Sequence, residues 1–473
     1  MFGVIIKKGL ADWQIVQQHG GVAEIGLAGE WTWPSELKEP VVMARVVDEE
    51  TSLPVIPWAK LATDPRGTFD GKLSAVPAGG LYRVETCLMS AELEDDYQWG
   101  GRGDMRHHVG VGDVYLIAGQ SNATGYAKDI GGDAMELGVH VFRANGKWTL
   151  AAHPLNDGTD SVFPENLETV NPGHSPYLLF AKRVKKAVGY PIGLIAGALG
   201  GSPLSAWNPG EDGALYRNVL ATVKAQGMGG ISGVLWYQGC ADACTARCDS
   251  YLDRFTSFVN AFRNDLKQPE LPFFTVQLNR LIAGNPTPEE DRAWGTLREA
   301  QRQASHTIPH VYVTPSNDGR LSDFVHNNTA ANLAIGERLA RQVLRHFHAG
   351  KLPCFAPEIR GARKVAEDQI ELTFDHVMGT LYLFEGDARY GRTLVSTRYS
   401  PFSVEDEAGV VPVTECRPFA KNRILLTTAR LFAGRVKVHG AHQVNPADYV
   451  PMDPDSQLPM LSFYGVEVRW QKG

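Results

Sequence analysis

The sequence lacks any run of apolar residues that approaches the roughly 18 needed to span a membrane. Its 473 residues include only 6 cysteines, too few for the disulfide framework that stabilises small secreted domains. Basic residues are not in excess either, because the formal net charge is -7, whereas nucleic-acid binders usually present a basic face. We therefore expect neither a membrane nor a nucleic acid as a partner.

The first residues also lack the order of a secretory signal. Such a signal places its positive charges before the apolar stretch, but here Lys7 and Lys8 follow a short apolar run. Asp12 and Trp13 come soon afterwards. The sequence therefore predicts a cytoplasmic protein.

The composition is that of a folded globular protein, with 43% hydrophobic and 21% charged residues. A chain of 473 residues exceeds what one hydrophobic core supports, so two or three domains are expected. Residues 1–108 contain short alternating apolar and polar runs separated by glycine and proline, without helical periodicity. This pattern predicts an N-terminal β-rich domain of the sandwich or jelly-roll type.

The pattern changes near Val111, where apolar strand-like runs begin to alternate with helical patterns. The clearest helical face carries Tyr251, Phe255, Phe258 and Phe262. The predicted strands are Val114–Ala118, Ile192–Ala196, Ile231–Trp236, Phe273–Leu278 and His310–Thr314. Continuously apolar strands indicate a parallel sheet that is covered on both faces. Their alternation with helices predicts a doubly wound, three-layer α/β domain over residues 109–350.

Helical periodicity ends again at Pro353, and residues 351–473 are predicted to form a C-terminal β-rich domain. The candidate strands are Gln369–Phe374, Thr380–Phe384, Ile424–Thr427, Arg435–His439 and Ser462–Trp470. This domain is either separate or packs with the N-terminal one. The fold class is therefore α/β, with a central sheet-and-helix domain between two β-rich regions.

Polar residues follow the predicted strands of the middle region, where an open α/β sheet binds its ligands. Ser121 comes after the first strand, on an expected tight turn into a helix that would expose its hydroxyl. The alternative is that Ser121 is a helix N-cap. Gly201 follows the second strand and Gln238 the third, so a backbone N–H and an amide could reach the same space. Taken alone, these two could equally be an ordinary glycine turn and a polar cap.

The loop after the fifth strand carries Asp323 and His326. A carboxylate three residues before a histidine can hold the imidazole in one tautomer and leave its other nitrogen to accept a serine proton. A single histidine among 14 is more often structural. Here the nucleophile, the donors and the Asp/His pair all follow strands of one sheet, so they should converge at one edge.

Cys240, Cys244 and Cys248 lie four residues apart. Thiolate ligation of a metal is one interpretation, and small buried cysteines or one incidental disulfide are the alternative. Cys240 is also an alternative nucleophile, although a reactive thiol needs its own positioned base.

These blocks resemble the SGNH-hydrolase superfamily and, within it, the sialate O-acetylesterase-like carbohydrate esterases. The similar segments are Ala118–Asn122 for the nucleophile block, Leu199–Pro203 with Trp207 for the glycine block, Val234–Gly239 for the third block, Leu297–Gln301, and Asp323–His326 for the terminal block. Two positions depart from the family pattern. Cys240 stands where the family usually has an acid, and Asn327 stands where it usually has proline.

The resemblance implies that Ser121 is the nucleophile, that His326 is the general base and then the acid, and that Asp323 orients this histidine. The oxyanion hole would consist of the Ser121 N–H, the Gly201 N–H and the Gln238 side chain. No metal and no other cofactor is expected.

The expected activity is a serine-dependent carbohydrate O-acetylesterase that removes acetyl groups from sugars or oligosaccharides through an acyl-enzyme. The alternatives are an esterase of acetylxylan or another short-acyl ester, and a non-catalytic glycan-binding protein. Trp31, Trp33, Trp99 and Trp207 could stack on sugar rings, or else pack inside the fold. The sugar, the hydroxyl position and the oligomeric state are not determined by the sequence.

Overall fold

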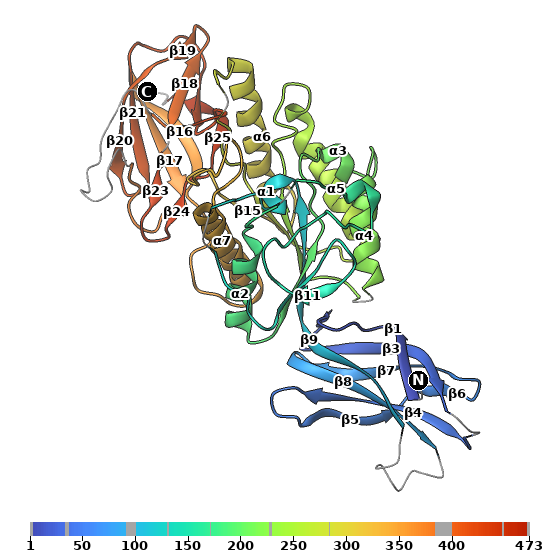
Figure 1. Cartoon of the computed structure of the whole chain (residues 1–473). Helices are drawn as coiled ribbons and strands as arrows, with labels where there is room; N and C mark the ends of the chain where they lie inside the picture. Colours follow the sequence, from blue (N-terminus) through green and yellow to red (C-terminus); the bar gives the residue numbers. More distant parts are fainter. Residues whose placement is uncertain are drawn as a thin grey trace.

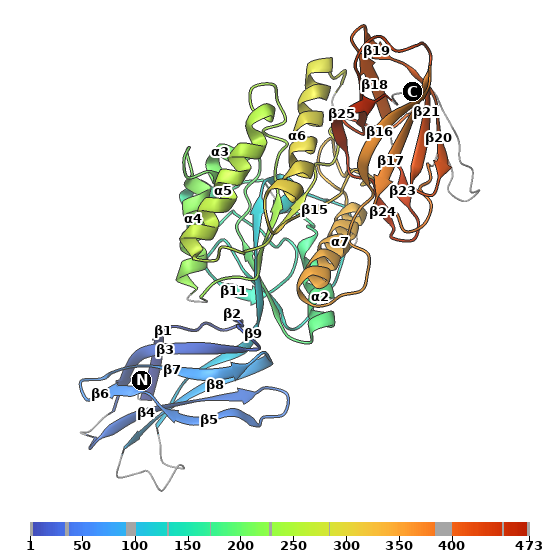
Figure 2. The same cartoon turned by 180° about the vertical axis from the view of Figure 1, so that it is seen from behind.

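The computed structural model describes residues 3–33, 37–90, 101–129, 132–170, 172–226, 229–282, 284–383, 400–446 and 449–470. The architecture is mixed α/β, with a region of sheet and helices between two β-rich regions (Figures 1 and 2). The β-rich regions lie at opposite ends of the molecule in both views, and within the described ranges they share no sheet. The domain boundaries near residues 108 and 350 stay predictions, and one strand, β9 (Gly101–Gly119), runs across the first of them.

The N-terminal region contains the short strands that alternation predicts. They are β1 (Gly3–Lys8), β2 (Ile15–Gln17), β3 (Val22–Thr32), β4 (Pro40–Asp48), β5 (Pro54–Lys60), β6 (Ala62–Asp64), β7 (Thr68–Pro77) and β8 (Gly79–Ser90). One sheet has the order β1-β3-β7-β6, and β4, β5 and β8 join the first half of β9. Buried side chains of both sheets form one hydrophobic core.

The central sheet begins with the second half of β9 and is mostly parallel. Its other strands are β10 (Val139–Phe142), β11 (Trp148–Leu150), β12 (Ile192–Ala196), β13 (Gly233–Tyr237), β14 (Phe273–Val276) and β15 (Val311–Thr314). The order is β11-β10-β12-β9-β13-β14-β15, in which only the β10–β11 pair is antiparallel. Because β12 and β13 flank β9 on either side, the chain reverses its direction of winding at the end of β9, where such sheets bind ligands.

Helices cover both faces of this sheet (Figures 1 and 2). They are α1 (Ser121–Thr124), α2 (Tyr177–Val188), α3 (Leu204–Trp207), α4 (Ala214–Ala225), α5 (Tyr251–Leu266), α6 (Pro288–Thr307) and α7 (Thr329–Phe347). In both views α2 and α7 lie together on one side and α3, α4 and α5 on the other. The long helix α6 was not predicted. No helix in the described ranges is long and apolar enough to cross a membrane.

The C-terminal region forms an eight-stranded sheet that packs beside α6 (Figure 1). Its strands are β16 (Glu358–Ala366), β17 (Gln369–Asp375), β18 (Phe402–Asp406), β19 (Gly409–Val411), β20 (Val413–Ala420), β21 (Arg423–Thr428), β22 (Val436–Gly440) and β25 (Phe463–Arg469), and β23 (Met452–Asp453) pairs separately with β24 (Leu458–Pro459). The strand predicted at Thr380–Phe384 does not form within the described residues. Only Tyr382 makes an isolated bridge, and Phe384 lies outside the described residues.

Candidate active site

Ser121 lies directly after the central strand β9, at the start of α1. Gly119 makes the turn between them with φ +130, and a Cβ there would collide with the backbone of Tyr237. Gln120 occupies the N-cap position, so Ser121 is the first residue of the helix and not its cap. The N–H groups of a first helical turn have no partner within the helix. Ser121 thus presents a hydroxyl and a backbone donor at the switch point of the sheet.

Asp323 and His326 form a hydrogen-bonded pair. Asp323 Oδ2 lies 2.6 Å from His326 Nδ1, and Asp323 Oδ1 accepts the N–H groups of Val325 at 2.8 Å and His326 at 2.7 Å. Burial raises the pKa of Asp323, but the hydrogen bonds and the charge of His326 outweigh it, so the pKa lies below its ordinary value. An ionised Asp323 accepts the Nδ1 hydrogen and leaves Nε2 as the acceptor nitrogen.

Asn122, which the sequence analysis did not single out, joins the nucleophile block to the histidine loop. Its Oδ1 accepts the Asn327 N–H at 3.0 Å, and its Nδ2 donates to the Val325 carbonyl at 3.2 Å. Asn122 therefore bonds both neighbours of His326 and ties the histidine loop to the residue that follows Ser121. Within the described part of the chain, no hydrogen bond joins the Ser121 hydroxyl to His326, and such bonds are often long in enzymes without substrate.

Asn327, which stands where the family resembled by the sequence usually has proline, contributes to the same support. Its Nδ2 donates to the Tyr237 hydroxyl at 3.1 Å, and its Oδ1 accepts from Asn279 Nδ2 at 2.9 Å. A proline at this position would lack the N–H that Asn122 accepts. The departure from the family pattern thus supplies three hydrogen bonds that fix the end of the histidine loop.

The predicted oxyanion donors differ in whether their N–H groups already have a hydrogen-bond partner within the protein. Gly201 has φ +66 and open space where a Cβ would stand, and no described hydrogen bond uses the N–H of Gly201 or of Ser121. Gln238 is fully buried, and its Nε2 donates to Asp242 Oδ2 at 2.6 Å and to the Ser202 carbonyl at 3.3 Å. Both amide hydrogens are therefore engaged within the protein. Gln238 thus bonds the glycine block at Ser202, and of the three predicted donors only the N–H groups of Ser121 and Gly201 have no described partner.

The cysteines are all free thiols. Burial raises the pKa of Cys240 to about 12, so its thiol is protonated at neutral pH and is a poor nucleophile. Cys244 and Cys248 do not belong to a group of potential metal ligands in the described residues. The predicted disulfide alternative is wrong, and the pKa of Cys240 argues against its role as a nucleophile.

Replacement of Cys240 by alanine is expected to leave kcat/KM within about 3-fold of the wild-type value. With a pKa of about 12, only on the order of 10⁻⁴ of the thiol is ionised at pH 8. Iodoacetamide at this pH should therefore leave the expected ester hydrolysis of the native protein intact. Loss of ester hydrolysis in the variant, with an unchanged melting temperature, would favour the thiol as nucleophile.

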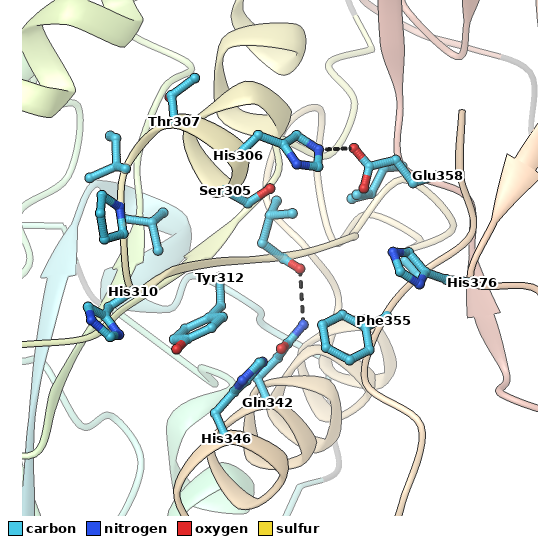
Figure 3. A pocket seen from close by; sticks show the side chains of 16 residues that line it. Ser305, His306, Thr307, His310, Tyr312, Gln342, His346, Phe355, Glu358 and His376 are labelled. Carbon is cyan, nitrogen blue, oxygen red and sulfur yellow. Dashed lines mark hydrogen bonds and ion pairs between the residues drawn. The ribbon is translucent and has the colours of Figure 1, made fainter. Parts of the chain in front are cut away.

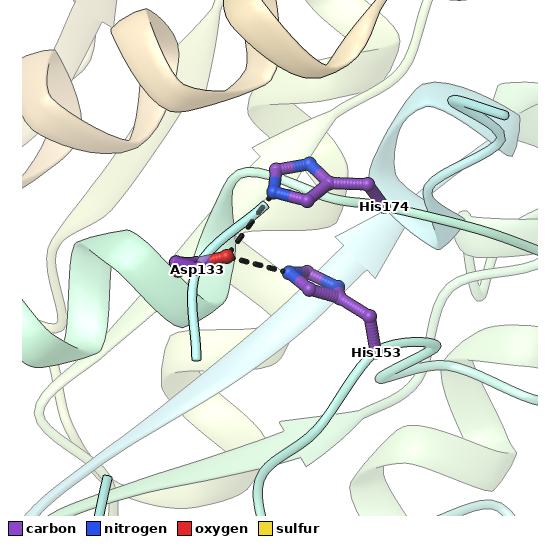
Figure 4. A group of neighbouring side chains, drawn as sticks. All are labelled: Asp133, His153 and His174. Atoms are coloured by element: carbon purple, nitrogen blue, oxygen red, sulfur yellow. Dashed lines mark hydrogen bonds and ion pairs between the residues drawn. The ribbon is translucent and has the colours of Figure 1, made fainter. Parts of the chain in front are cut away.

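One group of side chains in the described residues brings potential metal ligands together: Asp133, His153 and His174 (Figure 4). Asp133 Oδ1 lies 3.0 Å from His153 Nε2 and 3.1 Å from His174 Nε2. Two imidazoles and a carboxylate suit Zn²⁺. However, the Ser175 N–H donates to His153 Nδ1 at 3.4 Å, which puts the ring hydrogen on Nε2, facing Asp133. The group is therefore a hydrogen-bonded cluster, and through the His174 N–H, which donates to the Ala127 carbonyl, it supports the segment after α1.

A cavity of about 400 Å³ lies apart from these residues, where β15, α6 and α7 meet the C-terminal region (Figure 3). Two pairs of stacked rings line it. The ring centroids are 3.9 Å apart for Tyr312 and His346, and 5.1 Å apart for Phe355 and His376. None of the predicted site residues belongs to its lining. Of the candidate tryptophans, Trp31 and Trp207 are buried, Trp33 packs on the N-terminal core, and Trp99 lies outside the described residues.

Comparison with known proteins identifies the central region. Residues 111–345 match the model of a carbohydrate esterase family described as sialic acid-specific acetylesterase. The chain belongs to this family. A probable carbohydrate esterase of Arabidopsis thaliana is 27% identical over 256 residues, which cover 50% of this chain and 91% of that protein. The family match shows that this carbohydrate esterase is a carboxylic ester hydrolase. The same match supports activity on acetylated carbohydrate.

A solved structure extends the likeness over the whole chain of the esterase. A carbohydrate acetylesterase from Xanthomonas citri superposes with a TM-score of 0.67 at 21% identity, covering 97% of this chain and 99% of that one. At this identity the match shows a shared fold. Both β-rich regions therefore belong to an arrangement that another protein also adopts.

Proposed function

We propose that this carbohydrate esterase is a serine-dependent O-acetylesterase of the SGNH type. Ser121 Oγ attacks the acetyl carbonyl while His326 Nε2 takes its proton, and Asp323 stabilises the imidazolium that forms. The N–H groups of Ser121 and Gly201 hold the oxyanion. Loss of one such donor typically costs about 10²- to 10³-fold in kcat. The sugar oxygen then leaves with the proton of His326, and an acetyl group remains on Ser121.

Water completes the reaction on the same residues. His326 Nε2 removes a proton from the water, the resulting hydroxide attacks the acetyl carbonyl, and acetate leaves as Ser121 Oγ regains the proton. The observation that carries the proposal is the hydrogen-bonded link from Asp323 through His326 and its neighbours to Asn122, next to Ser121. A structural role for Asp323 and His326 alone would not require a link to the nucleophile block.

The test combines substrate preference with covalent trapping. The enzyme is expected to release acetate from acetylated sugars and from p-nitrophenyl acetate, and to cleave p-nitrophenyl butyrate at least about 10-fold more slowly if the acyl site is small. O-acetylated sialic acid and acetylated xylo-oligosaccharide, assayed side by side, distinguish a sialate esterase from an acetylxylan esterase. A serine-reactive phosphonofluoridate should add one adduct mass, located by peptide mapping at Ser121. An inert protein that binds these glycans unchanged would support the glycan-binding alternative.

A further inference from the structure

A second carboxylate lies beside the proposed oxyanion hole. Glu168 comes from the segment between β11 and α2, and its Oε1 accepts the Gly200 N–H at 3.1 Å. The same oxygen accepts a hydrogen bond from the Tyr126 hydroxyl. A Cβ on Gly200 would collide with the Glu168 carboxylate and the Tyr126 hydroxyl, so a larger residue there would displace these two side chains. Glu168 therefore holds the residue directly before Gly201.

Tyr126 carries this contact to the histidine. Its ring packs on the His326 ring, with centroids 4.8 Å apart and an interplanar angle of 37°. The Glu168 carboxylate thus connects the turn that presents the Gly201 N–H with the ring that backs His326. The proposed oxyanion donor and the proposed general base follow different strands, and Glu168 links them, directly at Gly200 and through Tyr126 at His326.

The buried carboxylate of Glu168 lowers the stability of the folded protein. Burial raises its pKa above the ordinary value, while hydrogen bonds from Tyr126 and Gly200 and the charge of His326 oppose this shift. Its second oxygen, Oε2, is buried and has no hydrogen-bond partner in the described residues. A buried carboxylate oxygen without a hydrogen-bond partner destabilises the folded state, because its desolvation is not compensated. Stability alone would favour a neutral side chain at this position.

We propose that Glu168 is a positioning residue for ester hydrolysis. It fixes the position of the Gly200–Gly201 turn, which presents the Gly201 N–H to the oxyanion, and through Tyr126 it fixes the position of the His326 ring. The proposal rests on the proposed serine mechanism. Displacement of a catalytic group by about 1 Å is enough to cost 10²-fold in rate. Glu168 itself contacts no reacting atom in this scheme.

The test compares Glu168→Ala with Glu168→Gln, using acetylated sugar and p-nitrophenyl acetate. The alanine variant is expected to lose about 10²-fold in kcat with KM within about 3-fold, because the donors are misaligned but still present. The glutamine variant keeps an oxygen that can accept from Gly200 and Tyr126. Its kcat is therefore expected to stay within about 5-fold of wild type. Its melting temperature should equal or exceed that of wild type, because the buried charge is gone.

Controls separate this proposal from the proposed function. Glu165→Gln, on the exposed neighbouring turn, should leave both kcat and KM unchanged. Tyr126→Phe keeps the ring on His326 and removes only its hydroxyl, so its loss in kcat should be smaller than that of Glu168→Ala. A folded Glu168→Ala with wild-type kcat, or a Glu168→Gln as impaired as the alanine variant, overturns the positioning role. Ser121→Ala is assayed in parallel, and full activity there would instead overturn the serine mechanism.

Discussion

The Ser121→Ala variant is expected to lose about 10⁴-fold or more in kcat on acetylated sugar, with little change in KM. Without the hydroxyl no acyl-enzyme can form, whereas the groups that bind the sugar and the backbone N–H groups at the end of β9 remain. A residual rate above that of water is expected, because the oxyanion donors can still assist direct attack by water. Acetate release under saturating substrate measures the loss, and circular dichroism confirms that the variant is folded.

Ser205→Ala is the matched control for this experiment. Ser205 lies in α3, directly after the glycine block, and forms no described side-chain hydrogen bond. Its replacement should leave kcat within about 2-fold of wild type. Retention of activity in Ser121→Ala would remove Ser121 from the mechanism. A comparable loss in both serine variants would instead indicate a general disturbance of this edge of the sheet.

The central strands could be predicted because their environment appears in their composition. The runs Ile192–Ala196 and Gly233–Tyr237 are apolar at every position or nearly so, and every residue in them is buried. A strand that is covered on both faces has no solvent-exposed positions and therefore needs no polar residues. A continuous apolar run thus indicates a strand that is buried on both faces. The order of polar residues after these strands then predicts which side chains come together, including Asp323 and His326.

Helix α6 was missed because its buried face mixes apolar and polar side chains. It buries Trp294 and Leu297, but also Arg298, Gln301 and Arg302, so the sequence shows no continuous apolar stripe. Arg298 is fully buried, and its guanidinium donates to the carbonyls of His442 and Gln443 in the C-terminal region. A local signal was present at the start of the helix. Thr287 and Glu290 form a capping box around Pro288, a combination that predicts a helix N-terminus.

The supporting residues of the site could not be predicted, since their partners are remote in sequence. Asn122 bonds residues more than 200 positions away, and Glu168 meets Gly200 and Tyr126 across two segments without regular structure. Gln238 is the opposite case, because the sequence predicted it as a donor to the site but could not predict the partners that its amide has within the protein. Its amide faces Asp242 and Ser202, which only the folded chain brings to it. Local patterns thus predict candidate reacting groups more readily than the groups that support them.

The Asp323→Asn variant is expected to lose on the order of 10³-fold in kcat while KM changes little. Asparagine can present its amide N–H to Nδ1 of His326, which would place the ring hydrogen on Nε2, so that Nε2 can no longer accept the serine proton. The variant also removes the negative charge that stabilises the imidazolium in the transition state. The expected loss is somewhat below the roughly 10⁴-fold of a buried triad carboxylate, because the Asp323 side chain is 40% exposed and water can partly replace it.

Asp318→Asn, in the same loop, separates catalysis from stability. Asp318 forms a two-point ion pair with Arg338, at 2.6 and 2.8 Å, and touches no proposed catalytic group. Its replacement should lower the melting temperature, because Arg338 is left buried without its counter-charge, and should leave kcat near the wild-type value at low temperature. Asp323→Asn should show the opposite combination, a nearly unchanged melting temperature and a large loss in kcat. If both variants lose stability and rate in proportion, Asp323 is a loop-fixing residue, and the orientation of His326 must depend on Asn122 and Tyr126 instead.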